Sequence, residues 1–72
     1  MDLFAQLNLT LREIRRRGCV VREEWLAEGE GGLCEIRGRL IFFSNIALPL
    51  PERLQHAKSA LRTLEKRDPL WD

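Results

Sequence analysis

Apolar residues recur along residues 2–17 at the three- and four-residue spacing of a single helical face. This pattern predicts an amphipathic helix. Asp2 is a suitable N-cap for this helix, and Gly18 is suited to the left-handed conformation in which many helices end. The residues that carry the apolar face are Phe4, Leu7, Leu11 and Ile14.

The same stretch also allows a shorter helix. Thr10 and Glu13 have the spacing of a capping box, and Leu9 with Ile14 has the spacing of the hydrophobic staple that accompanies it. The helix would then break near Asn8 and begin again at Thr10. We favour the longer helix, because an isolated piece of about seven residues is only marginally stable in water.

Residues 19–25 alternate between the two sides of an extended chain, and this period of two predicts a β-strand. Cys19, Val21 and Trp25 share one side of it. Residues 28–32 follow as a flexible connector that contains three glycines.

Residues 31–44, with the sequence GGLCEIRGRLIFFS, form the most apolar stretch of the chain. Two apolar runs, residues 33–36 and 40–43, are joined here by Arg37-Gly38-Arg39. Two β-prone runs around a glycine-bearing loop of about two or three residues are typical of a β-hairpin. Together with the preceding strand, the hairpin predicts a three-stranded antiparallel meander.

A second amphipathic helix is predicted over residues 51–66, with Pro51 in its first turn and Asp68-Pro69 at its end. The residues of its apolar stripe are Leu50, Leu54, Ala57, Leu61 and Leu64. The order is therefore helix, three strands, helix, which predicts an α+β fold (αβββα) in which both helices cover one sheet face as a two-layer sandwich. We expect residues 1–72 to form a single small domain.

The strand register predicts which face of the sheet the helices cover. A register that places Val21 opposite Ile36 also puts Ile41 and Phe43 on the covered face. Both cysteines would lie on this face, too far apart along it for a disulfide.

The opposite sheet face would then be apolar and uncovered, and it is the candidate interaction face. Its residues are Leu33, Leu40 and Phe42, joined by Trp71 from the C-terminal tail. An uncovered apolar face on a small domain usually marks an interaction surface, and a homodimer is its simplest form. The alternative is that Arg and Glu side chains, or Leu70 and Trp71, fold over this face.

Composition and charge restrict the function further. The chain has 72 residues, 44% hydrophobic and 32% charged, which is typical of a small folded protein whose stability is marginal without a partner. The candidate basic patch consists of Arg12, Arg15, Arg16 and Arg17. It suggests nucleic-acid binding as the alternative to a protein-interaction function. A net charge of only +1 argues against that alternative.

Candidate catalytic and metal-binding residues are few. His56 is the only histidine, and its segment His56-Ala57-Lys58-Ser59-Ala60 lacks the glutamate and second histidine of a zinc protease helix. The glutamates around the glycine-rich connector lack calcium-loop spacing. We therefore predict no catalytic residue, no metal and no cofactor.

The chain also lacks the features of a secreted or membrane protein. Met1 is followed by Asp2, and no apolar run approaches the roughly 20 residues that cross a bilayer. Two cysteines are too few for a disulfide framework. These features predict a cytoplasmic protein that does not bind membranes.

The hairpin sequence Gly31-Gly32-Leu33-Cys34-Glu35-Ile36-Arg37-Gly38, followed by Leu40-Ile41-Phe42-Phe43 and by Leu54 to Leu61, resembles a group of short uncharacterised bacterial proteins. These share a GG-x-C-x-x-x-G hairpin, an apolar strand and an amphipathic helix. The resemblance covers residues 18–65 and implies a bacterial origin, but it implies no activity. The residues themselves predict a non-enzymatic interaction or assembly module that self-associates through an apolar sheet face.

Overall fold

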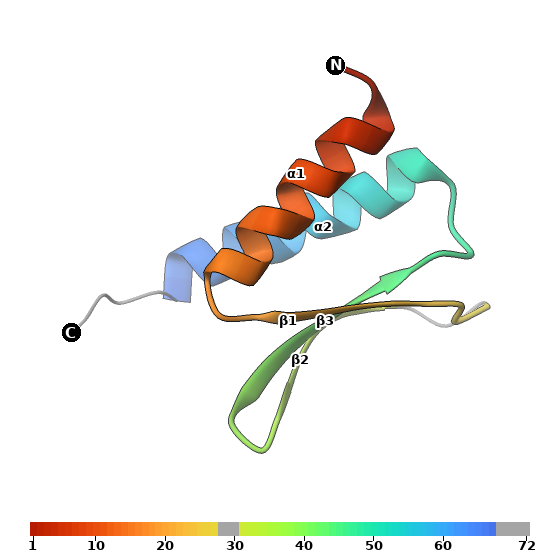
Figure 1. The fold of residues 1–72 in the computed structure, drawn as a ribbon. Helices are drawn as coiled ribbons and strands as arrows, with labels where there is room; N and C mark the ends of the chain where they lie inside the picture. Colours follow the sequence, from red (N-terminus) through yellow and green to blue (C-terminus); the bar gives the residue numbers. More distant parts are fainter. Residues whose placement is uncertain (28–30, 68–72) are drawn as a thin grey trace.

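The computed structural model, described here for residues 1–27 and 31–67, has two helices on one side of a three-stranded sheet (Figure 1). The elements in chain order are helix α1 (Leu3–Arg16), strands β1 (Val20–Glu24), β2 (Gly32–Ile36) and β3 (Arg39–Asn45), and helix α2 (Leu50–Arg67). The predicted α+β order of helix, three strands and helix is confirmed.

Helix α1 is continuous, so the longer of the two predicted helices is correct. The Ala5 N–H donates to Asp2 Oδ1 at 2.7 Å, which caps the first turn. Thr10 Oγ1 donates to the Gln6 carbonyl at 2.8 Å, as a threonine inside a helix does. Phe4 departs from the prediction: it is 57% exposed, because its end of the helix rises away from the sheet (Figure 1).

The sheet is mixed, so the predicted antiparallel meander is wrong. Its strand order is β1-β3-β2, with β1 parallel to β3 and β2 antiparallel to β3. The hairpin itself is confirmed, and its turn residues Arg37 and Gly38 have φ of +53° and +81°. Two positive φ values in a two-residue loop match the twist of the flanking strands.

Asn45, at the end of β3, connects this strand to the chain that follows β1. This side chain is 3% exposed and accepts hydrogen bonds from the N–H groups of Leu26 and Ala47, at 3.1 and 2.9 Å. Its Nδ2 also donates to the carbonyl of Ala27, at 3.3 Å. The Asn45 side chain thus provides hydrogen-bond partners for backbone groups of the loops, which have no neighbouring strand to pair with. It also holds the chain after β1 against β3.

The observed register reverses the predicted faces of the hairpin. Val21 lies opposite Phe42, and not opposite Ile36, and Phe42 lies opposite Leu33. Phe42 is 1% exposed, and Leu33 and Leu40 pack against the buried core. All three therefore lie on the helix-covered face, because β1 pairs with β3 and not with β2, and this pairing puts Val21 on the same side of the sheet as Phe42, Leu33 and Leu40.

The core lies between the covered sheet face and the two helices. Three leucine or isoleucine side chains of α1 and the small residues Ala57 and Ala60 of α2 allow close packing. The buried hydrophobic residues are Leu7, Leu11, Ile14, Cys19, Phe42, Leu54, Ala57, Ala60 and Leu64.

Candidate functional site

The sheet face opposite the helices carries a cluster of apolar residues beside Arg22, Glu24 and Arg39, and no other described helix or strand covers it (Figure 1). Val20, Ile41 and Cys34 form one row across all three strands, and Phe43 and Ile36 flank it. Cys34 is exposed, Val20 is 38% exposed and Ile36 is 48% exposed. We call these five residues the uncovered face.

Charges of both signs lie at the margin of the uncovered face. Arg22 stands beside Phe43 in the register, and its Nε donates to Glu24 Oε2 at 3.1 Å. Arg39 pairs with Ile36 at the hairpin end. Positive and negative side chains therefore lie side by side here, and neither sign of charge dominates the electrostatic potential.

The structure has a sheet face that no helix covers, as predicted, but this face consists of other residues than those predicted. Leu33, Leu40 and Phe42 belong to the covered side, and Trp71 lies outside the described residues. Apart from Val20, the face that the helices leave bare is formed instead by residues that the predicted register assigns to the covered face: Cys34, Ile36, Ile41 and Phe43. Both faces of residues 40–43 are apolar, so alternation alone contains no signal that could have told them apart.

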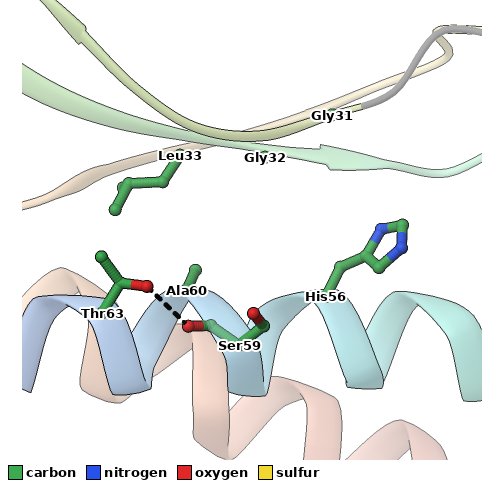
Figure 2. Close-up of a pocket in the computed structure, with 7 residues that line it drawn as sticks. All are labelled: Gly31, Gly32, Leu33, His56, Ser59, Ala60 and Thr63. Carbon is green, nitrogen blue, oxygen red and sulfur yellow. Dashed lines mark hydrogen bonds between the residues drawn. The ribbon is translucent and has the colours of Figure 1, made fainter.

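A groove of about 500 Å³ runs between β2 and α2, at the edge of the two layers (Figure 2). The strand forms one wall with Gly31, Gly32 and Leu33, and the helix forms the other with His56, Ser59, Ala60 and Thr63. A Cβ on Gly31 would clash with the carbonyl oxygen of Phe43, so this position requires glycine. The sequence pattern did not predict the groove, because it depends on where α2 lies relative to the sheet edge.

Hydrogen-bonding groups line the helical wall of the groove. The Thr63 hydroxyl donates to the Ser59 carbonyl at 3.2 Å, and the His56 ring points from α2 toward the strands (Figure 2). Among residues 1–27 and 31–67, the His56 ring and the Ser59 hydroxyl have no hydrogen-bond partner. At the hairpin end, Arg67 Nη2 lies 3.6 Å from Glu35 Oε1 and bridges the two layers.

The two thiols are free and lie on opposite faces of the sheet. Cys19 is buried on the covered side, and Cys34 is exposed on the other, so the prediction that they share a face is wrong. Burial raises the pKa of the Cys19 thiol above its ordinary value of 9.0, and a hydrogen bond with the Phe42 backbone opposes the shift. Cys19 is therefore a protonated core residue at neutral pH and a poor nucleophile.

The candidate basic patch lies on the outer side of α1 and just after it. Arg12 and Arg15 are exposed. Arg16 Nη1 lies 3.6 Å from Glu13 Oε1, and Arg17 Nη2 lies 3.6 Å from Glu65 Oε2. Nearby carboxylates offset part of the positive charge that phosphate binding needs. Nucleic-acid binding remains a prediction that no contact in the structure specifically favours.

The described residues contain neither a cluster of potential metal ligands nor a helix that could span a membrane. No cluster of three or more His, Cys, Asp or Glu side chains within residues 1–27 and 31–67 could hold a metal ion. In the same residues, neither helix is long and apolar enough to span a bilayer.

No protein-family model, curated protein or solved structure matches this chain. The resemblance of the hairpin to short bacterial proteins therefore remains a prediction.

Proposed function

We propose that this chain is a small cytoplasmic interaction or assembly module, without catalysis of its own, that self-associates through the uncovered face. The observation that supports the proposal is the unbroken apolar row of Val20, Ile41 and Cys34 across a sheet whose other face is already covered. A bare apolar sheet face has the character of half of a two-sheet core.

A second copy is the partner that this face fits best. Arg22 and Glu24 at its margin provide both signs of charge, so two identical faces can oppose each other without a net repulsion. A two-fold dimer also brings the same patch of both subunits together. Burial of both faces would supply apolar contacts that a domain of 72 residues has difficulty in obtaining alone.

The size of the face predicts the strength of the association. Strands about 4.8 Å apart and about five residues long, with a rise of about 3.3 Å per residue, give a three-stranded face of roughly 250 Å². Two such faces bury less than the total of about 1,200 Å² that is typical of stable complexes. We therefore expect a reversible dimer and not a permanent one.

Sedimentation velocity from about 10 µM to about 1 mM tests this proposal. We expect the sedimentation coefficient to rise with protein concentration, and the labelling rate of the Cys34 thiol to fall with it. Val20→Glu should weaken association at least about tenfold, because it buries a charge in the contact. The matched control is Leu9→Glu, since Leu9 is similarly exposed, at 45%, but lies on α1.

A monomer throughout this range, with a Cys34 labelling rate independent of concentration, would contradict the proposal. An equal loss of association in Leu9→Glu and Val20→Glu would also contradict it, because the contact would then not involve the uncovered face. Circular dichroism of both variants excludes unfolding as the cause.

A further inference from the structure

The two edges of the sheet differ in how they are protected against pairing with another chain. β1 carries charges at three of its five positions, Arg22, Glu23 and Glu24. β2 has the sequence GLCEI, with no proline and one charge, Glu35. Proteins usually protect an exposed edge with charges or proline, so β2 has the composition of an edge that accepts a further strand.

The backbone of β2 is also accessible from the groove. β2 pairs with β3 on one side only, and strand geometry directs the N–H and C=O groups of alternate residues to the outer side. Gly31 and Gly32 have no side chains to shield this backbone, and a Cβ on Gly32 would contact nothing within 4 Å. An extended chain can therefore approach the edge within hydrogen-bonding distance.

The groove beside this edge has two chemically different surfaces. Leu33 and Ala60 supply apolar surface, whereas His56, Ser59 and Thr63 offer hydrogen-bonding groups from α2. An extended peptide directs successive side chains to opposite sides. In a fourth strand beside β2, one set of alternate side chains would therefore face Leu33, Ala60 and the hydrogen-bonding groups of α2, and the other set would lie on the uncovered side of the sheet.

We propose that the groove between β2 and α2 binds an extended peptide segment of another protein, which adds to β2 as a fourth strand. Main-chain hydrogen bonds to the outer edge of β2 provide affinity, and the contacts with α2 select the sequence, as in other cases of β-strand addition. The volume of about 500 Å³ lies within the range of about 300–1,000 Å³ that is usual for ligand sites.

A short peptide fits this site better than the β2 strand of a second copy. The ion pair between Arg67 and Glu35, at 3.6 Å, bridges α2 and β2 at the hairpin end of the edge. Two-fold pairing of whole β2 strands would extend past Glu35 and meet this bridge. A peptide beside residues 31–33 stays within the part of the edge that borders the groove.

Selection from a phage-displayed library of random peptides of about seven residues, against the full chain, tests the inference. We expect the selected peptides to share residue preferences at every second position, where the side chains face the groove. A synthetic copy of the motif should slow hydrogen exchange at alternate amides of β2. Its affinity should fall at least about tenfold in Thr63→Trp, whose indole fills the groove. The matched control Arg62→Trp, on the neighbouring position of the same helix, should bind the peptide as the parent protein does.

Several results would overturn the inference. No enriched motif, or equal binding by Thr63→Trp and the parent protein, would exclude the groove. In the Val20→Glu variant, in which the dimer contact is weakened, protection of the β2 amides that rises with protein concentration and without peptide would assign the edge to a second copy. The Val20→Glu variant separates this site from the dimer contact, because it should bind the peptide with unchanged affinity even where it no longer self-associates.

Discussion

Phe42 and Phe43 are consecutive residues of the same type in the central strand, yet they belong to different environments. Phe42 is 1% exposed and packs in the core beneath the helices, whereas Phe43 is half-buried on the uncovered face. The difference does not lie in the residues themselves. It arises because both helices cover the same side of the sheet, so that one face of β3 becomes core and the other remains surface (Figure 1).

This comparison shows why the uncovered face is of functional interest. A strand with one solvated face usually alternates apolar and polar residues, but residues 40–43 of β3 are apolar on both sides. Strands with this pattern are typically buried on both faces. The pattern therefore agrees with a protein whose second sheet face is covered by a partner.

Truncation of the two phenylalanines is the strongest test of this comparison. Phe42→Ala should lower the free energy of unfolding by about 3–5 kcal/mol, because it leaves a cavity in the core. Phe43→Ala should lower it by only about 1 kcal/mol at low protein concentration, because its side chain is already partly in water. Urea unfolding of both variants measures the two values.

Equal losses in the two variants would mean that the helices do not distinguish the faces as described. A loss for Phe43→Ala that grows with protein concentration would instead sharpen the comparison, since it would report the dimer contact through mass action.

The sequence was a good guide to the helices and to the hairpin. α1 covers 3–16 where 2–17 was predicted, and α2 covers 50–67 where 51–66 was predicted. Both helices are defined by local signals: each has an apolar period, α1 begins after the cap Asp2, and α2 has Pro51 in its first turn. The turn at Arg37 and Gly38 is local as well, so the hairpin could also be predicted.

The order of the strands could not be predicted in the same way. Adjacent strands in sequence are neighbours in a sheet in only about two-thirds of cases, and the pattern of 19–25 does not state which strand lies beside it. The buried Asn45 side chain, which forms hydrogen bonds with Leu26 and Ala27 from 19 and 18 residues away, is an interaction of this non-local kind. An asparagine after an apolar run looks like an ordinary turn residue.

The error in strand order also explains why the candidate site was only partly predicted. The presence of one apolar face without a helix was inferred from the number of helices and strands. Its residues were assigned through a register that paired Val21 with Ile36 where the structure pairs Val21 with Phe42. The groove depends on the same tertiary arrangement, and no local pattern marks it.

Two neighbouring buried polar residues at the end of β3, Ser44 and Asn45, provide a second test, with an intermediate expected change in the free energy of unfolding. Asn45→Ala should lower the free energy of unfolding by about 2–3 kcal/mol, because the N–H groups of Leu26 and Ala47 lose their acceptor. Ser44→Ala is the matched control. Its Oγ is buried without a hydrogen-bond partner among the described residues, so its removal should change stability by less than about 1 kcal/mol or raise it slightly. Thermal unfolding compares the two variants, and a larger loss for Ser44→Ala would contradict this assignment.

The smallest expected effect concerns the buried thiol of Cys19. Because burial raises the pKa of Cys19 in the folded state, the folded protein binds its proton more tightly than the unfolded chain does. The stability that this provides is complete below the unfolded value near 9.0 and is lost as the pH rises toward the folded pKa. Urea midpoints measured from about pH 8 to about pH 10 should therefore fall less steeply in Cys19→Ala than in the parent protein. Equal slopes in Cys19→Ala and the parent protein would contradict the assignment of the Cys19 thiol to the core.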